Sequence, residues 1–170
     1  MSEEDRVLAL VKPVIDLSVR SLCVAPYPDH KKGCPNFNHK LGCPPKAKKI
    51  YELINLDKPI YAVWNRFDLG AHVEKMCEKH PDWSERQLYC CLWWQPKARK
   101  QLKLRIMAAM RGLKELMAEG LTTEGRLVLV ACPEAAGVDV TKTMANIGIE
   151  LEWPPRKYAY QVVLIGYEKG

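Results

Sequence analysis

Residues 23–45 read C-V-A-P-Y-P-D-H-K-K-G-C-P-N-F-N-H-K-L-G-C-P-P, and we expect the rest of the chain to fold around this stretch. It holds three of the seven cysteines, five of the twelve prolines and two of the four histidines. Its apolar residues follow neither the period of a strand nor that of a helix. A loop this long inside a small domain is uncommon unless something other than packing holds it. The cysteines therefore predict a metal-binding loop.

The composition is that of an ordinary globular protein, and the length suits one domain over residues 1–170. Hydrophobic residues make up 48% and charged residues 27%, which is typical of soluble domains. No long apolar run follows the acidic start, so we expect a cytoplasmic protein with no signal peptide, membrane span or membrane partner. Cytoplasmic thiols stay reduced, and an odd number of cysteines cannot all pair. Metal binding or redox chemistry is therefore favoured over disulfides.

Strands and helices are predicted to alternate along the chain. Strand patterns cover residues 14–22, 59–64, 126–131 and 158–167, and residues 65–70 have the composition of a polar turn. Helical patterns cover residues 3–13, 46–55, 71–79, 84–94, 97–119 and 140–147, with a capping-box spacing at Ser84 and Gln87. This alternation predicts an α/β fold: a single domain with a partly parallel sheet, flanked by helices and carrying a cysteine-rich metal loop.

Four cysteines form the candidate metal site: Cys23, Cys34, Cys43 and, far downstream, Cys132. All but the first precede a proline, and a Cys-Pro step also occurs in bacterial ferredoxin cluster motifs. Cys132 follows a predicted strand, where functional residues of α/β sheets commonly lie. Four thiolates drawn from one loop and one strand end suit a [4Fe–4S] cluster, because each sulfur must approach from a different direction. We expect this cofactor.

Other metals and ligands remain open on the sequence. Zinc accepts the same four thiolates and is the alternative metal, although the C-x2–4-C spacing of compact zinc sites is absent. Cys90 or Cys91 could replace Cys132 as the fourth ligand, whereas Cys77 is expected to be an ordinary cysteine on a helix face. The loop histidines are further candidates, although such residues are more often solvated; they are His30 and His39.

Both ends of the chain resemble a known family. The Cys-x10-Cys-x8-Cys-Pro-Pro loop, C-P-E-A-A-G-V-D-V-T-K-T at residues 132–143 and Y-Q-V-V-L-I-G at residues 160–166 are similar to the predicted metal-binding proteins designated domain of unknown function 2284. Members often carry a C-x2-C pair in the first loop and a second cysteine cluster ahead of a G-I-D-V stretch. This chain has the wider spacing and only Cys132 in the second region, and residues 58–121 show no similarity. The resemblance implies a metal and no particular activity.

The charge balance permits an anionic partner. Lys and Arg number 26 against 20 Asp and Glu, a formal net charge of +6, which suits RNA or a phosphorylated small molecule. The loop contributes Lys31, Lys32 and Lys46. A candidate substrate-binding set at the start of the long predicted helix combines aromatic and basic residues: Trp93, Trp94, Lys97, Arg99 and Lys100. No phosphate-loop, dinucleotide-binding or serine-hydrolase motif occurs.

These features favour an iron–sulfur protein with a sulfur-transfer or desulfuration role on an anionic thiolated substrate, such as a thiolated nucleotide or tRNA. That chemistry needs an iron with an open position, which can act as a Lewis acid toward sulfide or a thiolate. The alternative is a non-catalytic module, stabilised by zinc or by a cluster, that transfers electrons or binds RNA. Four cysteine ligands would saturate every iron and suit this alternative.

Overall fold

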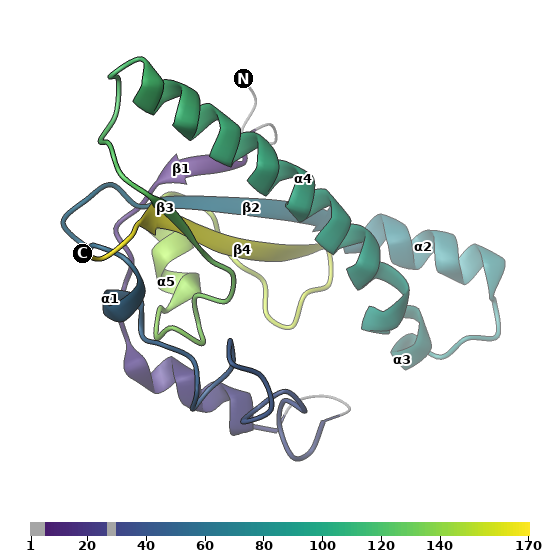
Figure 1. Cartoon of the computed structure of the whole chain (residues 1–170). Coiled ribbons are helices and arrows are strands. Elements are labelled where there is room, and N and C mark those ends of the chain that lie inside the picture. Colours follow the sequence, from purple (N-terminus) through teal and green to yellow (C-terminus); the bar gives the residue numbers. More distant parts are fainter. Residues whose placement is uncertain (1–5, 27–29) are drawn as a thin grey trace.

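The computed structural model describes residues 6–26 and 30–170, and its centre is a four-stranded antiparallel sheet (Figure 1). The strand order is β1-β2-β4-β3, with the bounds β1 Leu8–Leu10, β2 Tyr61–Asp68, β3 Leu127–Val130 and β4 Tyr158–Tyr167. The helical segments are the 3-10 helix η1 Leu17–Val24 and the helices α1 Ile50–Leu53, α2 Leu69–Lys79, α3 Glu85–Leu88, α4 Cys91–Ala118 and α5 Val140–Ala145.

The predicted partly parallel sheet is wrong, because every neighbouring pair of strands is antiparallel. Since β2 and β3 are each antiparallel to β4, they run in the same direction, as two strands joined through a crossover helix should. The C-terminal strand β4 lies between them and separates the expected parallel pair. The last five residues of β4, Val163–Tyr167, are all buried, so a central place in the sheet removes the most apolar surface from water.

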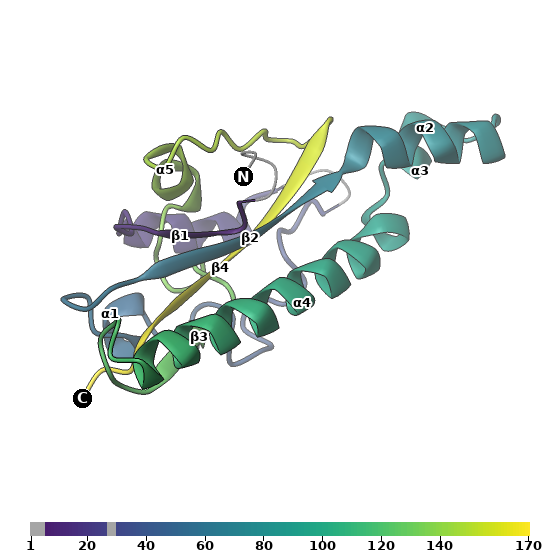
Figure 2. The same ribbon diagram turned by 90° about the horizontal axis from the view of Figure 1, so that it is seen from above.

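Helices cover both faces of the sheet (Figure 2). On one face the long helix α4 packs Ala109 and Leu113 against Val63 of β2 and against Val163 and Ile165 of β4. On the other face lie α1, α5 and the segment before α5, whose buried residues form the largest apolar cluster: Ile50, Ile54, Val138, Val140 and Met144, packed on Trp64 and Leu164. Successive residues of a strand point to opposite faces of the sheet. β2 and β4 therefore contribute side chains to an apolar core on each face.

Several predicted elements are confirmed. β3, β4, α2 and α5 lie within two residues of their predicted ranges, and Ser84 and Gln87 form the predicted capping box at α3. The long helix is also confirmed, but α4 begins at Cys91 and includes Pro96. Gly120 ends it with φ +70°, and backbone bonds from Gly120 and Leu121 return to the last turn, as in a Schellman-type end.

Three predicted elements near the N-terminus and at the end of β2 are wrong. The predicted helix at residues 3–13 contains β1, which pairs with Tyr61–Val63; its residues 3–5 lie outside the described part. The predicted strand at residues 14–22 is mostly η1, because the Asp16 side chain accepts the Ser18 N–H and caps a helix. The polar turn at residues 65–70 is absent, since β2 continues to Asp68 against β4.

The predicted helix at residues 46–55 is reduced to α1, a single turn at Ile50–Leu53. None of the helices in the described ranges combines the length and the apolar character needed to cross a bilayer.

Candidate metal centre

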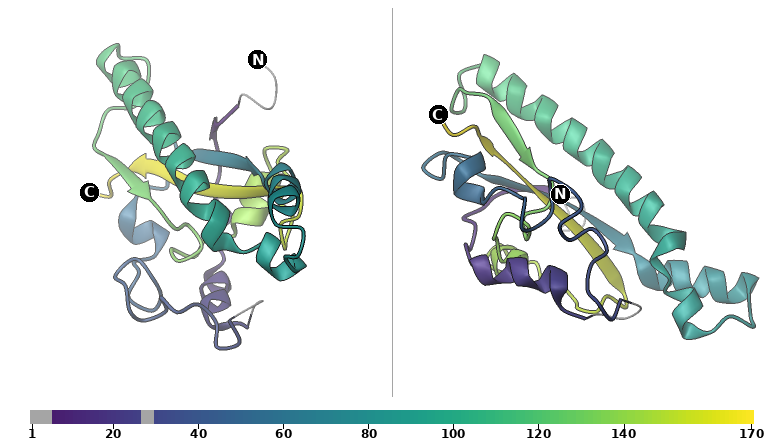
Figure 3. Two further views of the ribbon diagram at one scale, coloured as in Figure 1. Left: turned by 90° about the vertical axis from the view of Figure 1, so that its right-hand side faces the viewer. Right: turned by 60° about the horizontal axis from the view of Figure 1, so that its bottom comes forward.

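Three separate segments bring the four predicted cysteine ligands to one end of the molecule. Cys23 lies in the last turn of η1, Cys34 and Cys43 lie in the following loop, and Cys132 lies two residues after β3. Figures 1 and 3 show η1 and the loop together at the bottom of the fold, on the side of the sheet that carries α5. This grouping depends on a few backbone contacts rather than on long elements.

A short antiparallel bridge joins the segment before η1 to the segment after Cys132. Ile15 pairs with Val138, and the N–H of Asp16 donates to the carbonyl of Gly137 at 2.8 Å. Because Ile15 lies two residues before η1 and Val138 lies six residues after Cys132, the bridge fixes the start of η1 beside the turn that carries Cys132.

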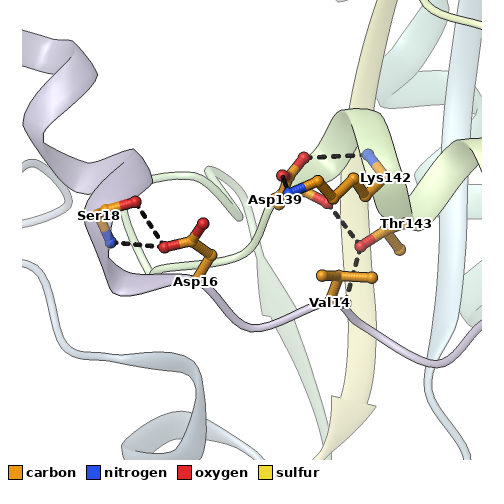
Figure 4. A network of polar contacts seen from close by, with 6 residues as sticks. All are labelled: Val14, Asp16, Ser18, Asp139, Lys142 and Thr143. Atoms are coloured by element: carbon orange, nitrogen blue, oxygen red, sulfur yellow. Dashed lines mark hydrogen bonds and ion pairs between the residues drawn. The ribbon is translucent and has the colours of Figure 1, made fainter.

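The first turn of α5 secures the other end of this bridge (Figure 4). The N–H of Asp139 donates to the carbonyl of Val14 at 2.8 Å. The N–H of Val14 donates to Thr143 Oγ1 at 2.9 Å, and the Thr143 hydroxyl donates to the carbonyl of Asp139 at 2.7 Å. Thr143 is buried, so these bonds satisfy polar groups that would otherwise be costly to remove from water.

The turn at residues 132–138 also holds the exit of the cysteine loop. The N–H of Val138 donates to the carbonyl of Pro133 at 2.9 Å, which closes the turn, and the N–H of Ile50 donates to the carbonyl of Ala136 at 2.9 Å. Lys49 is the N-cap of α1, and Ile50 is its first residue. The loop therefore leaves the cysteine region along the same turn that presents Cys132.

The entry of the loop is packed tightly against Cys23. The N–H of Cys34 donates to the carbonyl of Cys23 at 2.7 Å. Gly33 has φ +80°, and a Cβ at this position would lie 2.6 Å from that carbonyl oxygen and 2.7 Å from the Cα of Val24. Only glycine combines this backbone conformation with so close an approach. Gly33 thus sets the separation of the first two cysteines.

Arg20 of η1 connects the helix to the end of the loop. Its guanidinium donates to the carbonyl of Ala47 at 2.7 Å and to that of Pro45 at 3.3 Å. The N–H of Ala47 in turn donates to the carbonyl of Cys43 at 2.9 Å. One cation therefore binds two carbonyls just beyond the third cysteine of the loop, and holds this part of the loop beside η1.

The thiols of the four cysteines influence one another electrostatically. Burial raises the pKa of Cys23, and the negative charges of Cys34, Cys43 and Glu134 raise it further, while Arg20 lowers it. Burial raises the pKa of Cys132 to about 11, with further increases from Glu134, Cys23 and Cys43. Cys132 is exposed as a residue, so the protein packed around its sulfur, and not enclosure of the side chain, accounts for the effect. The charges of Cys34 and Cys43 thus reach Cys23, and those of Cys23 and Cys43 reach Cys132.

The thiols are spread too widely for a single ion. Among residues 6–26 and 30–170, no three Cys, His, Asp or Glu side chains are grouped closely enough to hold one metal ion. Zinc–sulfur bonds of about 2.3 Å would place tetrahedral sulfurs within about 4 Å of one another. A [4Fe–4S] cluster needs four thiolates farther apart, because each binds a different iron.

The other cysteines lie elsewhere. Cys77 is exposed on α2, and Cys90 and Cys91 begin α4. Cys132 is influenced by the charges of Cys23 and Cys43, and in the part of the chain that the structure describes neither Cys90 nor Cys91 is among the charges that act on Cys23 or Cys132. Of the fourth ligands considered from the sequence, the structure brings Cys132 to the loop.

The residues of the predicted substrate-binding set on α4 lie partly in the core and partly at the surface. Trp94 is buried and stacks on Phe67 at 5.6 Å between ring centroids, and its indole N–H donates to the carbonyl of Tyr89. It therefore belongs to the core and offers no open face to a base. Trp93 is 54% exposed and lies near Trp83. The basic residues Lys97, Arg99 and Lys100 are exposed along α4, outside the cysteine region.

Sequence reasoning missed three residues that shape the centre. Glu134 accepts a weak hydrogen bond from the Cys132 thiol at 3.8 Å, and burial raises the pKa of its carboxyl group. Arg20 and Gly33 act through backbone contacts described above. The sequence carried a signal for one of them: Glu134 follows the Cys-Pro step by one residue. The other two depend on contacts across the loop that no spacing indicates.

Comparison with known proteins adds no relative: no family model, no curated protein and no solved structure matches the chain. The resemblance to the metal-binding family thus remains an expectation from its motifs.

Replacing Thr143 with Val should weaken the anchor between η1 and the Cys132 turn. The substitution keeps the volume but leaves the Val14 N–H without its acceptor, so we expect a loss of about 1–3 kcal/mol in the free energy of unfolding. Thr141→Val is the matched control, because Thr141 is exposed on the same helix and surface changes usually stay within about 0.5 kcal/mol. Urea unfolding measures both, and equal stability of the two variants would contradict the anchor.

Gly33→Ala should abolish metal retention, because the added Cβ meets the Cys23 carbonyl and separates Cys34 from Cys23. Gly148→Ala is the control: Gly148 has φ +83° with no atom within 4 Å of its added Cβ, so it carries the same backbone strain, about 1–2 kcal/mol, without the contact. Iron and zinc per chain, measured after anaerobic reconstitution, report the difference, with circular dichroism as a check on folding. Equal metal content in two folded variants would count against the assigned role of Gly33.

Proposed function

We propose that this protein binds one [4Fe–4S] cluster through Cys23, Cys34, Cys43 and Cys132 and serves as an electron-transfer centre. The observation that supports the proposal is that the four cysteines lie in segments joined to one another by backbone hydrogen bonds, and that charges of neighbouring cysteines act on Cys23 and on Cys132. No catalytic chemistry is needed to account for that arrangement.

The negative charges around Cys23 and Cys132 favour a bound cation. Neighbouring cysteines raise the pKa of Cys23 and of Cys132, and Glu134 adds negative charge beside both. Four thiolates could not be held together at neutral pH without a cation, whereas a bound metal stabilises thiolates and releases their protons. The cluster would supply one-electron redox chemistry. The chain's own residues would position it: Arg20 at the loop exit, Gly33 at the loop entry, and the turn at residues 132–138.

The presence of four thiols favours one of the two functions considered from the sequence. A cluster with a cysteine on every iron has no open coordination position, which suits electron transfer or structural support. Sulfur transfer or desulfuration would require that one iron lack a protein thiolate. The placement of Cys132 beside the loop favours the saturated cluster, so sulfur transfer on a thiolated substrate or tRNA stays a prediction from the sequence. The zinc-stabilised module is likewise the alternative to the cluster.

Single Cys→Ser variants test the ligand set. After anaerobic reconstitution, we expect the wild-type protein to hold about four iron and four sulfide per chain, with a visible absorption band that dithionite bleaches reversibly. Changing Cys23, Cys34, Cys43 or Cys132 should remove most of the iron and this band. Cys77→Ser and Cys91→Ser should leave both unchanged, because these exposed residues lie outside the centre.

Three outcomes would overturn the proposal in whole or in part. Zinc bound in place of iron, with no sulfide, would make the centre a structural zinc site. A Cys132→Ser variant with full cluster content, together with loss of iron in Cys91→Ser, would show that the fourth ligand comes from α4. A cluster that cannot be reduced would remove the electron-transfer role while leaving the ligand assignment.

A further inference from the structure

A basic pocket opens beside Cys34, between the cysteine loop and α3. Its volume is about 760 Å³, and Cys34 and Gly33 form part of its wall. Arg86 reaches it from α3, more than forty residues further along the chain than the loop. This size lies within the range of about 300–1,000 Å³ that is usual for small-molecule sites. The pocket therefore has room for a ligand next to a candidate cluster ligand.

The charged lining of the pocket is of one sign. The loop contributes Lys31 and Lys32, α3 contributes Arg86, and two further side chains can carry a proton: His30 and His39. No Asp or Glu is among the described residues of its wall. Within residues 6–26 and 30–170, neither Lys31 nor Lys32 forms an ion pair. A guanidinium with two ammonium groups suits the oxygens of a phosphate.

The remaining wall is apolar. Phe37 is half-buried and Pro35 is exposed, and both line the pocket with Cys34. An aromatic ring beside a group of cations is the combination that binds a nucleotide, because the ring stacks on a base while the cations hold the phosphate. A free phosphate would use the cations and leave the apolar wall uncovered.

We infer that this pocket binds a nucleoside phosphate, with its phosphate on Lys31, Lys32 and Arg86 and its base against Phe37. The ligand would lie next to Cys34, so its relation to electron transfer rests on the proposed cluster, whereas the pocket itself does not. The site differs from the basic residues of α4 that the sequence favoured, since Lys97, Arg99 and Lys100 do not line it.

Calorimetric titration of the reconstituted protein with AMP tests the inference, with adenosine as the probe that lacks a phosphate. We expect AMP to bind one site per chain, at least about tenfold tighter than adenosine, because charge-assisted hydrogen bonds to phosphate contribute that much. Arg86→Ala and the double variant Lys31→Ala with Lys32→Ala should each weaken AMP at least about tenfold. Phe37→Leu should weaken AMP while leaving the weak binding of inorganic phosphate unchanged. Lys103→Ala is the matched control, since Lys103 is an exposed cation on α4 outside the pocket.

AMP binding no tighter than that of adenosine would overturn the inference, as would equal affinities of the Arg86→Ala and Lys103→Ala proteins. Binding of an RNA oligomer without binding of AMP would also overturn it, in favour of an extended nucleic-acid surface. Iron and sulfide measured on the same samples separate the two proposals. A protein that holds its cluster but does not bind AMP contradicts only the inferred nucleotide site. A protein that binds AMP but holds no iron contradicts only the proposed cluster.

Discussion

The antiparallel bridge between Ile15 and Val138 is the contact on which the candidate centre depends. It is short, yet it joins the segment that leads into η1 to the turn that follows β3. Without it, Cys23 and Cys132 would belong to separate surface segments. Its strength comes from backbone bonds that the buried Thr143 completes. A site built in this way needs few specific side chains outside its ligands, and most of its precision comes from the backbone.

The elements with strong apolar patterns could be predicted from the sequence, and their pairing could not. Tyr158–Tyr167 and Leu127–Val130 are strands as expected, because continuous apolar runs have few alternatives to a buried strand. The direction of pairing depends on which strand occupies the centre of the sheet. That place goes to β4, the last strand in the chain, which divides the expected parallel pair. The strand predicted for residues 14–22 is wrong for a local reason. The helix cap supplied by Asp16 outweighs an alternating apolar pattern of only a few residues.

For the site, the sequence identified the cysteines, while the structure supplied their framework. Cysteine–proline steps were enough to propose Cys34, Cys43 and Cys132 as ligands, and backbone hydrogen bonds join the segments that carry them to the segment of Cys23. The contribution of Gly33 arises from a close approach between two stretches of backbone, which leaves no trace in spacing. The aromatic pair at the start of α4 misled the prediction of a substrate surface, because Trp94 serves the core. The cations that do gather in a pocket come from the loop itself and from α3.

The central claim is that the four thiols hold a cluster and not a single ion. X-ray absorption spectroscopy at the iron and zinc edges of the reconstituted protein tests it directly, because scattering from a neighbouring metal distinguishes the two. For a bound cluster we expect iron with a shell of sulfur neighbours and a second shell of iron. Zinc surrounded by one shell of sulfur at about 2.3 Å, with no metal neighbour, would contradict it.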